Sequence, residues 1–568
     1  MFGFFSRAQR IREIAPDEIF LDSTNLPQFD AGQFEGRVER ALNRRAILAV
    51  GICFSIIALV FGYRAFALQV NQGAEYAGIS LNNTLERQVI FATRGLIYDR
   101  TGAEVAWNEA VISTTSAQTN TFPLRVYTKS PGLAHILGFV LYPKADAKGE
   151  WWREDYSGAS GVELAFDSAL AGVNGSTMVE SDALGNVERE NIVSPPRMGN
   201  DLHLAVDAEV QSELHSTLAA HASRMGFRGG AAIIMDVRTG ELIALTSFPE
   251  YDNQAFTDGV TDTVKDTTED ARSPQLNRAV SGLYTPGSIL KPMFAAAALK
   301  EGIITAEKEI LSTGAITLPN PYNPSAPSIF RDWTVHGLVD MRTAIAVSSD
   351  EYFYTIGGGY GGQRGLGIAK LDEYARLFGF GSETGIDLMG EESGVIPTPE
   401  WKARVFGPED PWRIGNTYHT VIGQYGFQVT ALQAVRYTAA IANGGKLLKP
   451  QLLASSTPEF MQLDIADEHL QVARDGMRLA VTSARSDATV KSLYIAGIKI
   501  AAKTGTAQLG VRNEYMNSWS VGYWPADEPK YAYAVVLERA RAGTASGAAP
   551  GLVPFFQWLV EQKPQYVK

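Results

Sequence analysis

The sequence is almost free of cysteine, because Cys53 is the only one among 568 residues. A single cysteine excludes an intramolecular disulfide and a zinc site built on several thiolates. Positive charge is not in excess either, since 50 Lys and Arg residues against 62 Asp and Glu residues give a net charge of −12. A dedicated DNA- or RNA-binding protein needs clustered cations, so we expect no nucleic acid partner.

Long apolar runs are rare, and the one at residues 46–63 (AILAVGICFSIIALVFGY) carries no charge. As a helix, this run spans about 27 Å, close to the ~30 Å hydrocarbon core of a bilayer. Four arginines occur in residues 36–45, whereas residues 65–86 contain no Lys or Arg. The asymmetry predicts a single-pass anchor in the plasma membrane over residues 46–68, with a cytoplasmic N-terminus and an extracytoplasmic bulk. A cleaved signal peptide and a buried soluble helix are the alternatives.

The remaining chain is long enough for several folding units and shows no repeat at a solenoid period. Residues 1–45 lack a sustained hydrophobic period and predict a flexible tail. Residues 69–205 contain short alternating segments, such as 87–91 (RQVIF), between Gly and Pro clusters, which predicts an irregular α+β spacer.

The character changes near residue 206, where the pattern predicts an amphipathic helix followed by two strands. Three more strands and a closing helix are predicted near the C-terminus. The expected segments are helix 207–225, strands 231–235, 241–247, 498–502, 518–523 and 531–538, and helix 552–561. We therefore expect an α+β fold in which residues 206–568 form one antiparallel five-stranded sheet, with helices inserted between its second and third strands.

Three short motifs carry the chemistry. In residues 284–299 (YTPGSILKPMFAAAAL), Ser288 would open a helix and Lys291 lies three positions later on the same face. A lysine there can accept the hydroxyl proton of a nucleophilic serine. Taken alone, the pair favours a serine helix cap beside a solvated lysine, because two fixed positions in four occur by chance in most chains of this length.

The second motif, residues 347–353 (VSSDEYF), contains Ser348 and Asp350, and the third, residues 501–508 (AAKTGTAQ), contains Lys503. Ser348 follows Ser288 by 60 residues, and Lys503 follows Ser348 by 155 residues. The combination S-x-x-K, S-x-D and K-T-G in this order resembles the penicillin-binding proteins and serine β-lactamases.

The resemblance extends to the N-terminal half. Residues 94–102 (RGLIYDRTG), 135–140 (HILGFV) and 160–172 (SGVELAFDSALAG) are similar to the pedestal, or dimerisation, module of class B penicillin-binding proteins. Residues 383–391 and 422–433, together with Asp350 where most relatives carry Asn, resemble the elongation-type penicillin-binding protein 2. This implies a cytoplasmic tail (1–45), an anchor (46–68), a pedestal (69–205) and a transpeptidase domain (206–568).

The resemblance also implies a peptidoglycan D,D-transpeptidase that crosslinks stem peptides through a serine acyl-enzyme and needs no cofactor. Ser288 would attack the penultimate D-Ala, Lys291 would be the general base, and Ser348 would relay a proton. Burial and the nearby cation Lys503 would lower the pKa of Lys291. The backbone N–H groups of Ser288 and Thr506 would form the oxyanion hole. The implied substrate-binding residues are Asp350, Lys503, Thr504, Gly505 and Thr506.

Asp332 and His336 (RDWTVH) precede Ser348 and could contribute to a structural metal site. Because the only cysteine lies in the predicted anchor, a loop histidine with satisfied hydrogen bonds is favoured, and we expect no metal.

The expected partners are stem peptides ending in D-Ala-D-Ala, β-lactams, the membrane, and a membrane glycosyltransferase of the shape, elongation, division and sporulation family. The last is expected because residues 69–205 are short for a polymerase module and match the pedestal. A D,D-carboxypeptidase, a division-type transpeptidase, a β-lactam sensor or β-lactamase, and a non-catalytic elongation scaffold are the alternatives.

Overall fold

The computed structural model describes residues 43–77, 85–110, 122–147, 151–181, 187–320, 323, 325–455 and 457–568. Nearly all of the predicted tail, residues 1–45, lies outside them. The chain divides into two compact units, which are Met1–Glu86 with Ser181–Asn186, and Arg87–Glu180 with Val187–Lys568.

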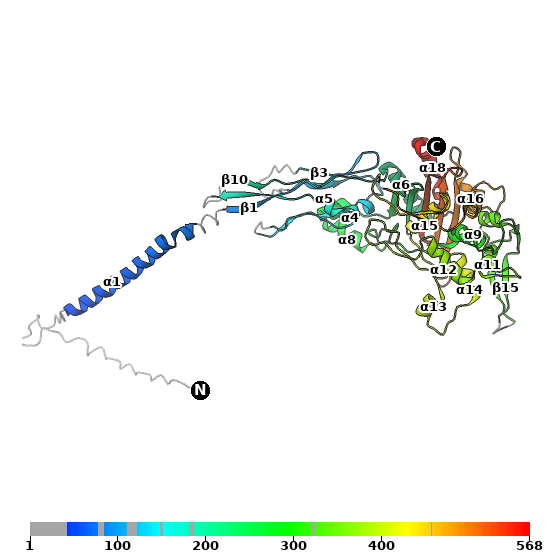
Figure 1. The fold of residues 1–568 in the computed structure, drawn as a ribbon, viewed down its shortest axis with the longest axis horizontal. Coiled ribbons are helices and arrows are strands. Elements are labelled where there is room, and N and C mark those ends of the chain that lie inside the picture. The colour runs from blue at the N-terminus through cyan, green and yellow to red at the C-terminus, as the bar shows by residue number, and fades with distance from the viewer. Residues whose placement is uncertain are drawn as a thin grey trace, which may run out of the picture. The chain divides into compact units, whose positions relative to one another are not determined.

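In the first unit, the apolar run forms helix α1 (Arg44–Phe66), which continues as a π-helical turn over Ala67–Asn71 (Figure 1). The side chain of Asn43 caps the helix by accepting a hydrogen bond from the Arg45 N–H. No residue of α1 is buried, and the segment Arg44–Asn71 is long and apolar enough to cross a membrane. This length and composition fit the predicted anchor at 46–68.

The second unit begins with short strands, as the Gly- and Pro-punctuated sequence predicts. Strands β1 (Leu85–Ile90), β9 (Gly175–Ser181) and β10 (Val187–Ser194) form one sheet in the order β1-β9-β10. Another sheet has the order β11-β2-β3-β4, with β11 (Leu202–His203), β2 (Ile97–Tyr98), β3 (Glu104–Glu109) and β4 (Leu124–Tyr127). The smaller elements are α3 (Ala134–Leu137), β5 (Val140–Leu141), β6 (Lys144–Ala145), β7 (Trp151–Arg153), β8 (Ser157–Gly158), α4 (Gly161–Ala165) and α5 (Asp167–Leu170).

Buried charges hold this strand-rich part together. The side chains of Arg94, Arg125 and Glu163 are fully buried, and both guanidinium groups pair with the one carboxylate, at 2.6 and 2.7 Å. Removing Glu163 would leave the buried cation of Arg125 without this counter-ion and Arg94 with Asp167 alone, which is far more costly than losing an exposed pair.

The larger part of the second unit is organised by a five-stranded antiparallel sheet in the order β13-β12-β22-β21-β20 (Figure 1). Its strands are β12 (Gly229–Asp236), β13 (Leu242–Phe248), β20 (Ala501–Leu509), β21 (Tyr515–Trp524) and β22 (Tyr531–Arg541). All five predicted strands are present. The predicted strand 498–502 is wrong at both ends, because β20 starts at Ala501 and carries the whole K-T-G motif.

Both faces of this sheet are covered. Along β12, Ile233 and Met235 belong to the core shared with helices α9 and α15, whereas Ile234 belongs to the core shared with α6 and α18. Side chains alternate between the two faces of a strand, so a central strand with cores on both sides is apolar throughout. Helices α6 (Ala208–Met225) and α18 (Val553–Gln562) closely match the predicted helices 207–225 and 552–561.

The long insertion between β13 and β20 supplies the helices that carry two of the three motifs. They are α7 (Asn253–Asp258), α8 (Thr261–Glu269), α9 (Lys291–Lys300), α10 (Met341–Val347), α11 (Asp350–Gly358), α12 (Gly367–Leu377), α13 (Pro399–Phe406), α14 (Ile414–Val421), α15 (Ala431–Ala442) and α16 (Asp467–Thr482). Short strand pairs lie between them: β14 (Ile310–Ser312) with β17 (Gly337–Val339), β15 (Ala315–Leu318) with β16 (Ser328–Arg331), and β18 (Lys446–Leu448) with β19 (Phe460–Gln462). Helix α16 packs against α9, α10 and β20, so one helix contacts an element of each motif.

Candidate active site

Ser288 lies in a 3₁₀-helical turn, Gly287–Leu290, that leads directly into α9. The prediction that Ser288 opens the α-helix is wrong by one turn, because α9 begins at Lys291. Side chains at positions i and i+3 of a 3₁₀ turn eclipse each other, so Ser288 and Lys291 still share one face. Ser288 is half-buried, and its hydroxyl forms no hydrogen bond to another residue in the described part of the chain.

Gly287 allows the turn that carries Ser288 to approach the K-T-G strand. Its φ is +60°, and a Cβ at this position would lie 2.8 Å from the carbonyl oxygen of Thr506. On the opposite side, a Cβ at Gly505 would lie 2.6 Å from the carbonyl oxygen of Pro286. Real Cβ atoms are not found this close to a backbone oxygen, so both glycines are needed for the third motif to lie beside Ser288.

Lys291 is fully buried at the start of α9 and joins the first motif to the second. Its ammonium group donates hydrogen bonds to the Ser348 carbonyl oxygen at 2.7 Å, to Ser348 Oγ at 3.3 Å and to Asp350 Oδ1 at 2.6 Å. Asp350 is thus the ion-pair partner of Lys291 within the site.

Ser348 adopts a left-handed conformation, with φ 60° and ψ 39°, at the C-terminus of α10. This conformation is unusual for a residue with a side chain and persists only where the surroundings enforce it. The next residue, Ser349, caps α11 by accepting a hydrogen bond from the Tyr352 N–H at 3.2 Å. Ser348 therefore lies between two helices and faces both lysines of the site.

Lys503 brings the third motif to the same point. Its Nζ donates to Ser348 Oγ at 2.8 Å and to the Thr504 carbonyl oxygen at 2.8 Å. Burial, together with the nearby charge of Lys291, lowers the pKa of Lys503 well below the usual range of lysine.

Asp350 lies at the first position of α11 and is the counter-ion of Lys291. Burial raises the pKa of its carboxyl group, and the charge of Lys291 acts in the opposite direction. Because the pKa of the Asp350 carboxyl group is raised, transfer of a proton from Lys291 to Asp350 costs less free energy. Such a transfer would leave Lys291 neutral.

Strand β20 is an edge of the five-stranded sheet, because its described neighbour in the sheet is β21 alone. Thr506 is exposed and Thr504 is half-buried, whereas Gly505 is buried against the turn of Ser288. An edge strand presents unpaired backbone N–H and C=O groups, so β20 can bind an extended peptide next to Ser288.

Every predicted site residue thus lies in one region. Lys291, Ser348, Asp350 and Lys503 are joined by hydrogen bonds, Ser288 precedes Lys291 by one turn, and the T-G-T segment lies beside the turn of Ser288.

Sequence reasoning missed one supporting contact, in which the buried Trp519 donates its indole N–H to the Thr285 carbonyl oxygen at 2.9 Å. A lone tryptophan in an apolar strand gives no signal for such a bond.

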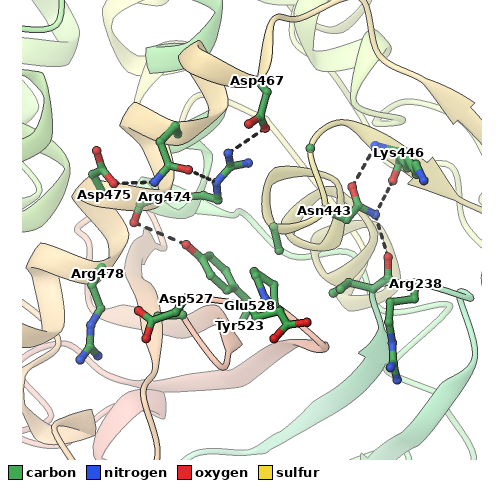
Figure 2. Close-up of a pocket in the computed structure, with 16 residues that line it drawn as sticks. Arg238, Asn443, Lys446, Asp467, Arg474, Asp475, Arg478, Tyr523, Asp527 and Glu528 are labelled. Atoms are coloured by element: carbon green, nitrogen blue, oxygen red, sulfur yellow. Dashed lines mark hydrogen bonds and ion pairs between the residues drawn. The ribbon is translucent and has the colours of Figure 1, made fainter. Parts of the chain in front are cut away.

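A cavity of about 700 Å³ lies away from this region, between α16 and the turn after β21 (Figure 2). Among its side chains, Arg474 donates to Asp467 at 2.7 Å and to Gln471 at 2.9 Å, whereas Arg238, Asp475 and Asp527 form ion pairs with residues outside the lining. None of the predicted site residues lines it, so the motifs, not this hollow, define the candidate active site.

The family described as "Penicillin binding protein transpeptidase domain" matches residues 230–553, and "Penicillin-binding Protein dimerisation domain" matches residues 113–204. The first match alone covers more than half of the chain. The chain therefore belongs to the penicillin-binding protein transpeptidase family.

Within this family, the chain is similar to penicillin-binding protein 2, as the motifs predicted. It is 31% identical to the peptidoglycan D,D-transpeptidase MrdA of Escherichia coli over 74% of this chain and 69% of that protein. It is 29% identical to MrdA of Acinetobacter baumannii over 94% of this chain and 90% of that protein. Penicillin-binding protein 2 of Helicobacter pylori, solved in complex with MreC, superposes with a TM-score of 0.69 at 26% identity, over 84% of this chain and 99% of that chain.

Proposed function

We propose that this protein is a membrane-anchored peptidoglycan D,D-transpeptidase of the elongation type, acting through an acyl-enzyme on Ser288. The two MrdA relatives named above are called peptidoglycan D,D-transpeptidases. The observation that carries the assignment of residues is the hydrogen-bonded chain from Lys291 through Ser348 to Lys503, directly beside the turn of Ser288.

In the proposed reaction, Ser288 Oγ attacks the carbonyl carbon of the penultimate D-Ala of one stem peptide. The peptide bond between the two D-Ala residues breaks, an ester to Ser288 forms, and the terminal D-Ala leaves as an amine after taking up a proton through Ser348. An amine of a second stem peptide then attacks the ester, forms the crosslinking amide and returns the proton to Ser288.

Lys291 is the proposed base for the Ser288 hydroxyl proton. To accept it, the amine must first give up a proton, and Asp350 Oδ1, at 2.6 Å and with a raised pKa, is an acceptor within reach. Lys503 and the T-G-T segment would hold the terminal carboxylate of the substrate by charge-assisted hydrogen bonds. The backbone N–H groups of Ser288 and Thr506 would stabilise the oxyanion, where one donor is typically worth ~3 kcal/mol.

We place the N-terminus in the cytoplasm and the catalytic domain outside the membrane, because arginines precede α1 and no Lys or Arg follows it in residues 65–86. The proposed organisation is a tail (1–45), an anchor (46–68), a pedestal (69–205) and a transpeptidase domain (206–568). Glycan polymerisation would fall to a separate membrane glycosyltransferase of the shape, elongation, division and sporulation family. The Helicobacter pylori structure makes an MreC-type protein a second proposed partner.

The decisive experiment labels the full chain with a fluorescent penicillin, followed by intact-mass measurement and peptide mapping. We expect one long-lived adduct on Ser288 and none in Ser288→Ala. Rapid release of the label would indicate a β-lactamase, and an adduct on another residue would contradict the site. A second assay uses peptidoglycan strands as substrate: crosslinked dimers support the transpeptidase, and trimmed monomers indicate a carboxypeptidase. Unaffected growth of a Ser288→Ala strain would indicate a non-catalytic scaffold.

A further inference from the structure

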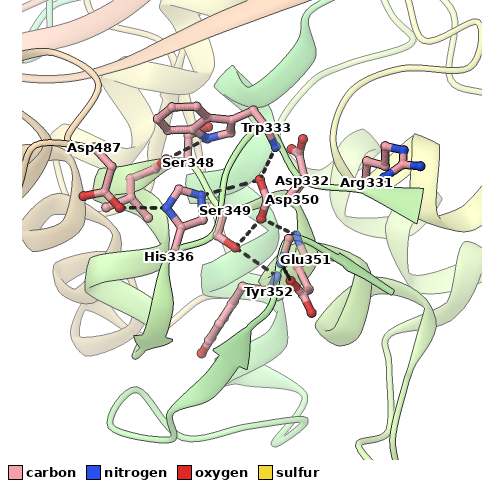
Figure 3. Close-up of polar contacts among 12 residues, drawn as sticks. Arg331, Asp332, Trp333, His336, Ser348, Ser349, Asp350, Glu351, Tyr352 and Asp487 are labelled. Atoms are coloured by element: carbon pink, nitrogen blue, oxygen red, sulfur yellow. Dashed lines mark hydrogen bonds and ion pairs between the residues drawn. The ribbon is translucent and has the colours of Figure 1, made fainter. Parts of the chain in front are cut away.

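Three side chains, two of them fully buried, form a polar cluster next to Ser349 and Glu351 (Figure 3). His336 Nδ1 lies 2.8 Å from Asp487 Oδ2, and its Nε2 lies 3.5 Å from Asp332 Oδ1. The side chains of Asp332 and His336 are completely buried, and that of Asp487 is 15% exposed. We call Asp332, His336 and Asp487 the carboxylate–histidine triad. Burying such charges is costly, so the arrangement calls for a role beyond general stability.

Asp332 holds the start of the helix that carries Asp350. Its Oδ2 accepts hydrogen bonds from the Ser349 hydroxyl at 2.8 Å and from the Glu351 N–H at 2.9 Å. A carboxylate at this end also favours the helix dipole of α11. The residues on both sides of Asp350 are therefore tied to Asp332, and this fixes the carboxylate that pairs with Lys291.

Neighbours of the triad hold the last turn of α10, directly before Ser348. The indole N–H of Trp333, adjacent to Asp332, donates to the Val347 carbonyl oxygen at 3.1 Å. The N–H of Thr489, two residues after Asp487, donates to the Ala346 carbonyl oxygen at 3.3 Å. These carbonyls lie at a helix end and lack intrahelical partners, so the two segments complete the backbone that keeps Ser348 left-handed.

The triad also joins two segments that are far apart in sequence. Asp487 is held by Arg485, whose Nε and Nη2 lie 2.9 and 2.8 Å from its two oxygens. Arg485 Nη2 donates at 2.9 Å to the His336 carbonyl oxygen as well. The loop that follows α16 is thereby connected through His336 to the segment that precedes β17.

We propose that Asp332, His336 and Asp487 are positioning residues that hold Ser348 in its left-handed conformation and Asp350 against Lys291. They touch neither Ser288 nor the T-G-T segment, so they act through the second motif. The inference rests on the proposed function, because its effect is measured as the rate at which Ser288 is acylated.

The test uses full-length protein in detergent and compares His336→Gln and Asp332→Asn with the wild type. Stopped-flow mixing with a fluorescent penicillin separates non-covalent affinity from the rate constant of acylation. We expect that rate constant to fall roughly 10- to 100-fold, the scale of a displacement of about 1 Å in a reacting group. Non-covalent affinity should stay within about twofold, because the carboxylate-binding strand is not touched.

His215→Gln is the matched control. His215 is also a buried histidine of the same domain, with Nδ1 2.8 Å from Thr246 Oγ1 and Nε2 3.7 Å from Glu250 Oε1, but it lies on α6. We expect this variant to lose thermal stability and to keep its acylation rate. The double variant Asp332→Asn/His336→Gln should be no slower than the worse single variant, because both changes release the same segment.

Acylation in the triad variants at the rate of His215→Gln would overturn the inference, and so would fully multiplicative effects in the double variant. If Asp332→Asn does not fold, Asp487→Asn provides the same measurement at a partly exposed position. Failure of the proposed function is distinguishable, because the wild type would then show no adduct on Ser288.

Discussion

The ammonium group of Lys503 lies 2.8 Å from the hydroxyl oxygen of Ser348, although the two residues are 155 positions apart. The contact joins the edge strand of the sheet to the junction of two helices. Because Ser348 also lies within hydrogen-bond distance of Lys291, one hydroxyl lies between two lysines. This relationship underlies the first two predictions.

Replacing Lys503 by methionine should lower the second-order rate of acylation by roughly 10- to 100-fold, the equivalent of one charge-assisted hydrogen bond of about 1.5–3 kcal/mol. The change removes the cation that would bind the substrate carboxylate and keeps the apolar volume. Fluorescent penicillin kinetics provide the measurement. Lys300→Met, which removes an exposed pair with Asp464 at the other end of α9, should leave the rate unchanged.

The rate of acylation should fall as the pH rises into the alkaline range, with an apparent pKa below 10.5, the usual pKa of a lysine side chain. Burial lowers the pKa of Lys503, so its ammonium group loses the proton earlier as the pH rises, and with it the charge that attracts a carboxylate. A pH profile of acylation checks this, with Lys503→Arg as the control. A wild-type profile identical to that of Lys503→Arg, which stays charged, would refute the assignment.

Gly287→Ala should reduce acylation more than 100-fold, because the added Cβ would lie 2.8 Å from the Thr506 carbonyl oxygen and force the two motifs apart. Gly302→Ala is a close control, since its φ of +59° nearly equals the +60° of Gly287 and no atom lies within 4 Å of its Cβ. Both variants should lose roughly 1 kcal/mol of stability through backbone strain. Equal acylation rates in the two variants would show that close approach is unimportant.

Stability in acid should depend on Asp332. Burial opposes its ionisation, but the pairing with His336 and the charge of Lys291 outweigh this and lower its pKa to about 2. A depressed carboxyl pKa stabilises the folded state above about pH 4, and this stabilisation is lost as the pH falls toward 2. The pH-dependent part should be about 2 kcal/mol. Thermal unfolding should therefore show the wild type and Asp332→Asn converging between pH 5 and pH 2, and a constant difference would contradict the assignment.

Much of the fold follows from local pattern. The strands of the central sheet and helices α6 and α18 were predicted because their apolar residues recur with the period of each element. The strand carrying Lys503 was placed wrongly, since Ala502, Lys503 and Gly505 are poor strand formers and the strand forms through pairing with β21. Local propensity cannot reveal a pairing of this kind.

The site was predicted as a set of residues but not as a set of contacts. Motif order was enough to gather Ser288, Lys291, Ser348 and Lys503. The partner of His336, Asp487, lies 151 residues later, and the indole of Trp519 bonds to Thr285, 234 residues earlier. Distant pairs like these form through the packing of whole helices, which no motif records.

The open side of β20 has a consequence for recognition. A substrate peptide aligned there would be bound mainly through its backbone peptide groups, which all amino acids share. The enzyme would therefore tolerate varied side chains along much of the peptide. Selectivity would then depend on two features of the peptide, which are the charge that faces Lys503 and the scissile bond that faces Ser288.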